Sequence, residues 1–171
     1  MSAGRLPSLA SVAILAILIV VLVTGHGDDS NDKLAASTQA RVTRVVDGDT
    51  VEATVEGKTE DVRYIGIDTP ESVKPDTPVE CYALEASHFN ERLVEGEEVR
   101  LDFDAERRDV YGRLLAYVHL GDRFVNADLV RLGYARTLTI APNTRYANLF
   151  DRLEREAAAD ERGLWSECDG R

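Results

Sequence analysis

Lysine is scarce in this sequence, and acidic residues are in large excess. Its 171 residues include 3 lysines and 17 arginines against 31 aspartates and glutamates, which gives a formal net charge of −11 at pH 7. A surface of this sign repels nucleic acid at long range, which argues against a protein that coats DNA and much less against an enzyme. So little lysine also indicates a protein kept soluble at high salt, as in halophiles, where charges are screened within roughly 3 Å. An ordinary acidic protein is the alternative.

Cysteine is almost absent, with only Cys81 and Cys168. Neither has a cysteine or histidine partner at the spacing of a zinc site, which argues against zinc. One disulfide between them would persist in an exported protein and would tie the end of the chain to the first long helix. Closing a loop of this size is worth about 4 to 5 kcal/mol at most. Two unrelated thiols are the alternative.

Long apolar runs are absent except at the N-terminus. No charged residue lies between Leu6 and Gly25, a length that spans a bilayer as a helix. Arg5 precedes this run and aspartates follow it, so the N-terminus is expected in the cytoplasm and the remainder outside. Residues 1–25 are therefore predicted to be a transmembrane anchor or a cleaved signal peptide with a weak cleavage site. The protein is expected to be extracytoplasmic, either anchored to the membrane or secreted.

The remainder is organised as one domain. Residues 26–40 are polar and small, which is typical of a flexible linker. Residues 41–168 are long enough to bury a core without further support, and we expect a monomer.

Turn residues divide this domain into short β-rich runs and longer helical patterns. Strands are predicted at residues 41–46, 50–55, 59–67, 98–103 and 114–120. Helices are predicted at 80–94, from an Asn126 cap to Gly133, and at 144–162. The predicted fold is α+β and mainly β: a five-stranded OB-type Greek-key barrel with three helices packed against it, preceded by the N-terminal hydrophobic helix.

Two acidic segments suggest a metal site. Asp49 lies between a turn and a strand, and Asp68 ends another strand. Carboxylates without a nearby histidine or thiol favour a hard cation, Ca²⁺ or less well Mg²⁺. Asp47 is placed to act through a water molecule, and the carbonyl group of Thr69 adds an oxygen. Taken alone, an Asp-Gly-Asp-Thr run is more typical of a structural turn.

Two arginines and one glutamate complete a possible site. Arg63 precedes Asp68 by five residues, and this odd spacing places the two on opposite faces of a straight strand. A shared site therefore requires a bend near Gly66, which glycine permits. Arg113 can hold a phosphate with two parallel hydrogen bonds. Glu71 lies in a loop, where it can hold a water molecule. Each residue alone has a likelier structural explanation, but together they suit metal-assisted cleavage of a phosphodiester.

The order and spacing of these runs resemble the thermonuclease family, the calcium-dependent nucleases of the staphylococcal nuclease type. The matching runs are VVDGDTV, VRYIGIDTPES, ECYALEA, DVYGRLLAYV, VNADLVRLGYA and GLWSE. They extend over residues 41–167. The resemblance implies catalytic roles for Arg63, Glu71 and Arg113, and calcium binding by Asp49, Asp68 and the carbonyl group of Thr69.

The resemblance also implies a reaction. Water attacks the phosphodiester in line, oriented or deprotonated by Glu71, while the metal and both arginines stabilise the growing negative charge. In this family the products carry a 5′-hydroxyl and a 3′-phosphate, and single- or double-stranded DNA and RNA are substrates.

The sequence departs from the family at its substrate contacts. Relatives often carry tyrosines before the Pro-Asn turn, where this chain has Thr139 and Ala141, and Val110 stands where a lysine is common. Base stacking is worth about 1 to 3 kcal/mol per base, so we expect weaker nucleotide affinity. Tyr111 remains a candidate substrate contact, with simple packing as the alternative.

Two other functions remain open. One is a catalytically inactive OB-fold module that binds nucleic acid, but degenerate copies lose the arginines or the glutamate that this chain keeps. The other is a calcium-binding surface domain, which would need only Asp49 and Asp68. His88 and His119 require no special role.

Overall fold

The structure is a computed structural model that describes Met1 and residues 37–73 and 78–168. Most of the segments predicted to be an anchor and a linker, residues 2–36, lie outside the described residues. The chain divides into two units, Met1–Ala35 and Ala36–Arg171, and every described helix and strand belongs to the second. Within the described ranges, no helix has the length and apolar character needed to cross a bilayer.

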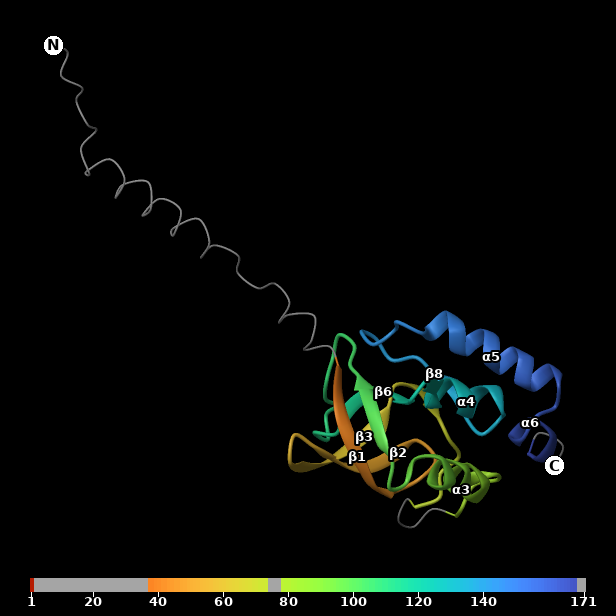
Figure 1. The fold of residues 1–171 in the computed structure, drawn as a ribbon. Helices are drawn as coiled ribbons and strands as arrows, with labels where there is room; N and C mark the ends of the chain where they lie inside the picture. Colours follow the sequence, from red (N-terminus) through yellow and green to blue (C-terminus); the bar gives the residue numbers. More distant parts are fainter. Residues whose placement is uncertain (2–36, 74–77, 169–171) are drawn as a thin grey trace. The chain divides into compact units, whose positions relative to one another are not determined.

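Five strands of the second unit form a closed barrel (Figure 1). They are β1 (Ser37–Val45), β2 (Thr50–Val55), β3 (Lys58–Tyr64), β5 (Glu98–Asp102) and β6 (Leu114–Leu120). Antiparallel pairing runs in the order β3-β2-β1-β5-β6, and parallel pairing of β3 with β6 joins the two ends. A short strand, β7 (Arg123–Phe124), extends the sheet beyond β6. The prediction of a five-stranded OB-type barrel in a mainly β protein is confirmed.

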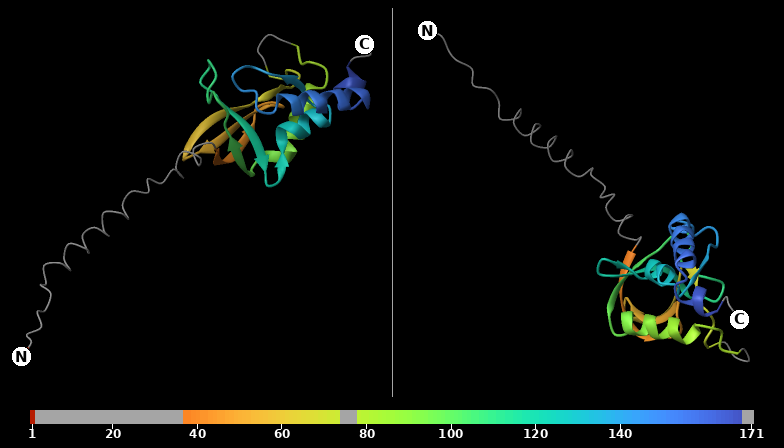
Figure 2. Two further views of the ribbon diagram at one scale, coloured as in Figure 1. Left: turned by 90° about the horizontal axis from the view of Figure 1, so that it is seen from above. Right: turned by 90° about the vertical axis from the view of Figure 1, so that its right-hand side faces the viewer.

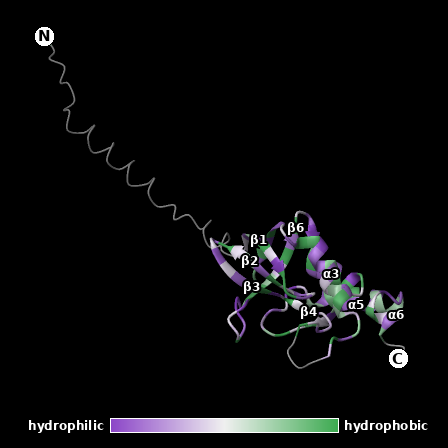
Figure 3. Ribbon diagram, turned by 90° about the horizontal axis from the view of Figure 1, so that it is seen from below, coloured by the Kyte–Doolittle hydropathy of each residue, from purple (hydrophilic) through white to green (hydrophobic). Residues whose placement is uncertain are grey.

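Alternation of side chains along the strands builds the core. In β2, Val51, Ala53 and Val55 face inward and are buried, while the residues between them are partly exposed. β1 begins at Ser37, four residues before the boundary that composition indicated, because residues 37–40 pair with β5. On the helix α3 (Ala83–Val94) the buried residues recur every three or four positions, so polar and apolar residues are mixed along it (Figure 3). The largest fully buried side chains include Tyr64, Tyr117, Phe150, Ile67 and Leu101.

The chain bends sharply after β3, where a single strand was predicted. Gly66 has a φ of +81°, and a Cβ atom there would lie 2.6 Å from the Phe150 ring. After the bend, β4 (Gly66–Asp68) leaves the barrel and pairs with β8 (Arg136–Leu138). The prediction of one strand over residues 59–67 is therefore wrong at its end. β8 was missed because three residues are too few to show an alternating pattern.

Helices cover the barrel on its outside. They are α3 (Ala83–Val94), α4 (Val125–Arg131), α5 (Ala147–Ala159) and the single turn α6 (Leu164–Glu167). α3 packs beside β1, whereas α4 and α5 lie against each other and contact β6 and β8, respectively (Figure 2). The three predicted helices are confirmed, and each is shorter than its predicted range. The single turn α6 was not predicted.

Asn126 does not cap α4, contrary to the sequence prediction. The cap position is Phe124, which makes no side-chain cap hydrogen bond. Asn126 lies inside the helix, where its Oδ1 accepts a hydrogen bond from Val118 N at 2.9 Å and its Nδ2 donates to Ile65 O at 2.9 Å. Its amide therefore joins the bend after β3 to the barrel wall.

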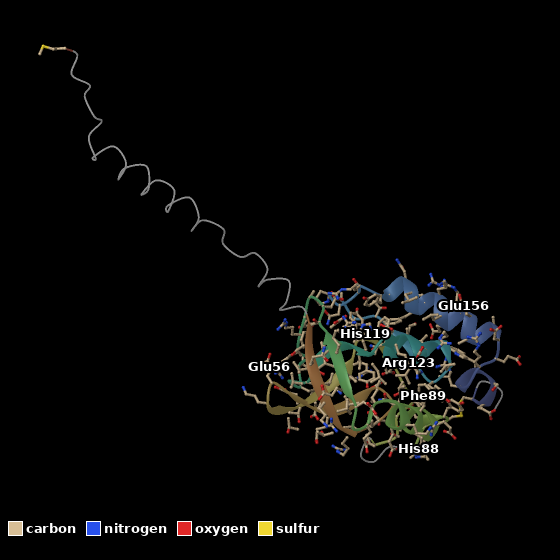
Figure 4. The ribbon with its side chains drawn as sticks, viewed as in Figure 1. Glu56, His88, Phe89, His119, Arg123 and Glu156 are labelled. Atoms are coloured by element: carbon tan, nitrogen blue, oxygen red, sulfur yellow. A yellow bond between two sulfur atoms is a disulfide. The ribbon has the colours of Figure 1, made fainter. Side chains whose placement is uncertain are left out.

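The described histidines have structural surroundings. His88 is exposed on α3, and its neighbour Phe89 stacks on Tyr134 with ring centroids 4.4 Å apart (Figure 4). His119 stacks on Phe124 at 4.6 Å, and burial lowers the pKa of His119. His119 is largely buried in this aromatic cluster, with its Nε2 3.3 Å from Asp102 Oδ2, and is a packing residue.

Cys81 and Cys168 form the predicted disulfide, with Cα atoms 5.8 Å apart. It links the segment before α3 to the end of α6, across 87 residues of sequence. α6 is itself held on the core, because Leu164 is buried and its N–H donates to Gly133 O at 2.9 Å. The bridge therefore fixes the start of α3 to an anchored C-terminal segment.

Replacing both cysteines by serine is expected to lower the free energy of unfolding by about 2 to 5 kcal/mol, because the unfolded chain regains the entropy of a long open loop. Urea unfolding followed by Trp165 fluorescence measures the change. Wild type in reductant is the matched control and should lose the same amount. A change below about 1 kcal/mol would show that the bridge does not constrain the unfolded chain.

Candidate active site

Arg63 lies at the centre of the candidate site and is largely buried, with 14% of its side chain exposed. Its Nη1 donates to the carbonyl oxygens of Tyr64 and Ile67, at 2.7 and 2.8 Å. Its Nε pairs with Asp49 Oδ1 at 3.1 Å, and its Nη2 with Asp68 Oδ1 at 2.8 Å. The bend between β3 and β4 thus wraps the backbone around the guanidinium group. The expected bend is present, and it brings Arg63 and Asp68 together.

Asp49 is the buried acid of the site, with 4% of its surface exposed. Its Oδ2 accepts hydrogen bonds from Thr69 N at 2.7 Å and from Thr69 Oγ1 at 3.1 Å. Thr69 also packs on Gly48, where a Cβ atom would approach the threonine side chain to 2.7 Å. The turn before β2 and the end of β4 are therefore locked together through one carboxylate.

Three carboxyl groups at this point oppose one another electrostatically. Burial, together with the charge of Asp49, raises the pKa of Asp47 to about 6. Burial also raises the pKa values of Asp49 and Asp68, against the lowering influence of Arg63. Asp68 remains accessible, with 56% of its side chain exposed. A bound cation would relieve this repulsion.

The three carboxyl groups do not form a closed set of ligands. Across residues 37–73 and 78–168, no group of three or more histidine, cysteine, aspartate or glutamate side chains is arranged to hold a metal ion. Any ion here would therefore draw part of its coordination from backbone oxygens or water, as hard cations commonly do.

Arg113 is positioned by Asp109, which sequence analysis did not single out. Asp109 Oδ2 accepts from Arg113 Nε at 2.7 Å, and its Oδ1 accepts from the backbone N–H groups of Tyr111 and Arg113 at 3.0 Å each. Partial burial would raise the pKa of Asp109, but these hydrogen bonds outweigh it and hold the pKa below its usual value. The sequence does contain a signal for this contact: Asp109 precedes Arg113 by four residues, with a glycine turn between them.

Arg63 and Arg113 line the same cavity, of about 330 Å³. Tyr111 stands at the cavity with 82% of its surface exposed, and the Arg113 guanidinium carbon lies 5.5 Å from its ring centroid. The wall from the stretch before the Pro-Asn turn is formed by Leu138 and Ile140. Thr139 and Ala141, which the sequence analysis named there, are not among the lining residues. The remaining lining residues are Tyr64, Ile65, Gly66, Ile67, Glu106, Asp109, Val110, Leu115 and Asn143.

Glu71 lies beyond the end of β4 and does not line this cavity. Its backbone N–H donates to Glu80 Oε2 at 2.9 Å, and its carbonyl oxygen accepts from Glu80 N at 2.9 Å. Its own Oε1 accepts from Val73 N at 2.8 Å. Glu80 precedes Cys81, so the disulfide secures the segment that positions Glu71.

Two buried amides support the site from behind, and sequence analysis missed both. Asn90 on α3 accepts from the Tyr64 hydroxyl at 3.2 Å and donates to the carbonyl oxygen of Asp47 at 3.4 Å. Asn143 exchanges two hydrogen bonds with the backbone of Glu106, at 2.7 and 2.8 Å. The first supports the acidic turn and the second joins two walls of the cavity. Their partners are distant in sequence, so no local pattern shows them.

Two arginines line one cavity beside a group of carboxylates on a closed barrel, and this arrangement is suited to binding an anionic group such as a phosphate. Comparison with known proteins identifies the family. A model described as staphylococcal nuclease homologue matches residues 61–167. The chain belongs to the staphylococcal nuclease family, and it is a nuclease whose substrate is nucleic acid.

The relatives carry corresponding names. The chain is 42% identical over 159 residues to a thermonuclease of Staphylococcus intermedius, which covers 90% of this chain and 95% of the relative. It is 38% identical over 157 residues to a thermonuclease of Staphylococcus hyicus, covering 91% and 93%. It is also 42% identical over 125 residues to the endonuclease YncB of Bacillus subtilis, covering 72% and 59%.

The two arginines should differ in their effect on stability. Arg63→Met is expected to lower the free energy of unfolding by about 3 to 5 kcal/mol, because Asp49 would be left as a buried, unpaired charge. Arg113→Met removes a more exposed ion pair and should cost about 1 kcal/mol or less. Urea unfolding at pH 7 in the presence of chelator measures both. The double variant Arg63→Met/Asp49→Asn should recover part of the loss, and equal losses for the two single variants would contradict this account.

Proposed function

We propose that this nuclease is a calcium-dependent phosphodiesterase that cleaves DNA and RNA by in-line attack of water and leaves 3′-phosphate ends. The observation that carries the proposal is the convergence of Arg63 and Arg113 on one cavity, with Arg63 paired to both Asp49 and Asp68. Two guanidinium groups facing one space suit the equatorial oxygens of a phosphate.

The donor atoms at the acidic turn fit a hard cation. Asp49 and Asp68 would supply carboxylate oxygens, the carbonyl group of Thr69 another oxygen, and Asp47 would act through water. Burial is the main cause of the raised pKa values of these aspartates, and their mutual repulsion is a smaller cause. A bound cation would relieve that repulsion, which supports the assignment. When bound, Ca²⁺ would neutralise phosphate charge and make a nearby water molecule more acidic.

The chain's own side chains perform the remaining steps. Asp109 occupies Nε of Arg113, and no described residue hydrogen-bonds to the terminal nitrogens, which can therefore donate to a phosphate. Arg63 would donate to the same group. Glu71, positioned by Glu80, would orient the attacking water and accept its proton at a carboxylate oxygen. Tyr111 would contact the substrate at the cavity.

The same proposal includes where and in what state the enzyme works. It is extracytoplasmic, held by the segment at residues 1–25 or secreted after its cleavage, monomeric, and adapted to high salt. The disulfide supports export, because such bonds persist in oxidising compartments. The charge of −11 with 3 lysines supports work in salt, where repulsion of nucleic acid is screened.

Digestion of single-stranded DNA and RNA by the purified domain tests the function. Cleavage is expected with Ca²⁺ and not with chelator, and it should persist from about 0.1 M to about 3 M salt. Polynucleotide kinase should label the products directly, because cleavage would leave 5′-hydroxyl ends. Binding without cleavage under every condition would favour the inactive nucleic-acid-binding module. Calcium binding with neither cleavage nor nucleic-acid binding would favour the surface domain.

Single substitutions test the site residues. Glu71→Gln and Arg113→Ala are expected to lower kcat by about 100-fold or more with little change in KM, because both groups act mainly in the transition state. Steady-state cleavage of an oligonucleotide measures both constants. Arg155→Ala, an exposed arginine on α5, is the matched control and should leave both unchanged. Unchanged kcat in either site variant would show that the residue has been misassigned.

A further inference from the structure

The loop that carries Arg113, residues 109–113, takes its shape from its own hydrogen bonds. Asp109 N donates to Arg113 O at 3.1 Å, and Gly112 N donates to Asp109 O at 3.0 Å. The carboxylate of Asp109 also accepts its hydrogen bonds from groups within this loop. Such contacts set the internal geometry of the loop, but they cannot fix where the loop lies on the barrel.

Packing does little to hold the tip of this loop. Val110 and Tyr111 are 93% and 82% exposed. Among the described residues, no atom lies within 4 Å of the place where a Cβ atom of residue 112 would stand. The placement of the loop therefore depends on polar contacts.

Arg108 supplies such contacts, because its guanidinium group joins the loop to β3. Its Nη1 donates to the carbonyl oxygen of Gly112 at 2.6 Å. The same nitrogen and Nη2 donate to the two carboxylate oxygens of Glu60, at 2.8 and 2.9 Å. This two-pronged arrangement is the most directional ion pair that proteins form. Glu60 is itself fixed in the barrel, since it pairs with Ala53 on β2. The hydrogen bonds from Arg108 hold the pKa of Glu60 below its usual value, so the carboxylate is charged at neutral pH.

The strand that holds Arg108 also carries Arg63, three residues after Glu60. The Glu60–Arg108 pair therefore ties the loop of Arg113 to the strand of Arg63. We propose that Arg108, held by Glu60, is a positioning residue that keeps Arg113 at the right distance from Arg63 across the cavity. Arg108 is not among the residues that line this cavity. The inference rests on the proposed function, since it takes Arg113 to act on the scissile phosphate.

Kinetics of single and double variants test this role. Arg108→Ala and Glu60→Ala are each expected to lower kcat about tenfold with little change in KM, because a displaced Arg113 loses contacts made mainly in the transition state. The double variant should be no slower than Arg108→Ala alone, since both substitutions break the same connection. Steady-state cleavage of an oligonucleotide with Ca²⁺ measures both constants.

An ion pair elsewhere on the surface provides the matched control. Arg123 pairs with Asp128 at 2.8 Å and has 51% of its side chain exposed, against 48% for Arg108. Arg123→Ala should leave kcat unchanged. The thermal midpoints of all these variants should fall by only a few degrees, because exposed ion pairs contribute little to stability.

A direct contact between Arg108 and substrate would give a different pattern. Arg108→Ala would then raise KM, whereas Glu60→Ala, which frees the guanidinium group, would lower KM. That pattern would overturn the proposal, as would additive losses in the double variant or an unchanged kcat in Arg108→Ala.

Mobility of the loop can be measured without activity. In Arg108→Ala, ¹⁵N relaxation of the Gly112 and Arg113 amides should show lower order parameters than in wild type, and unchanged values would refute the proposal. An unchanged kcat in Arg113→Ala would instead refute the proposed function, while the relaxation data would still report whether Arg108 holds the loop. A lowered kcat in Arg113→Ala with an unchanged kcat in Arg108→Ala would refute only the role of Arg108.

Discussion

The buried ion pair between Arg63 and Asp49 is the interaction on which the rest of the site depends. A buried carboxylate is costly unless it is paired and hydrogen-bonded, and Asp49 is both. The same guanidinium group binds two backbone carbonyl oxygens across the bend after β3. One side chain therefore fixes the path of the chain, the position of the acidic turn and the orientation of Asp68. A substitution of Arg63 would therefore change both the backbone of the bend and the carboxylates of the site.

The supporting contacts show how a small barrel holds such a site rigid. Asp109 fixes Arg113, Glu80 fixes the segment that carries Glu71, and Asn143 fixes the cavity wall. Each of these contacts joins a polar side chain to a neighbouring turn or loop. The barrel supplies the frame, and these side chains align loops that would otherwise move independently.

Much of this arrangement could be predicted from residue order. Alternating apolar residues and turn residues predict the five barrel strands. Grouped carboxylates without a nearby histidine or thiol predict the acidic part of the site. The bend at Gly66 was predicted in principle, because Arg63 and Asp68 could share a site only if the strand broke between them. The disulfide followed from having only two cysteines in a chain expected to be exported.

Other features depend on contacts that no local pattern contains. Asparagine is a common helix cap, yet Asn126 lies inside α4, where its side chain makes hydrogen bonds to two residues distant in sequence. The sequence analysis considered only Thr139 and Ala141 in the stretch before the Pro-Asn turn, whereas Leu138 and Ile140 are the residues of that stretch that line the cavity. The cavity wall there is aliphatic, in line with the expected lack of tyrosines in this stretch. Both side chains are exposed at the cavity, and neither offers a ring on which a base could stack.

Parallel pairing of β3 with β6 has a consequence for how the site assembles during folding. Arg63 pairs in register with Leu115, two residues after Arg113, so the two arginines meet only when β6 docks and the barrel closes. That closure joins segments about fifty residues apart, so it costs more chain entropy than the pairing of neighbouring strands. A chain that has formed only its first three strands has the acidic turn but not the second arginine. The two arginines of the candidate site therefore come together only in a chain whose barrel has closed.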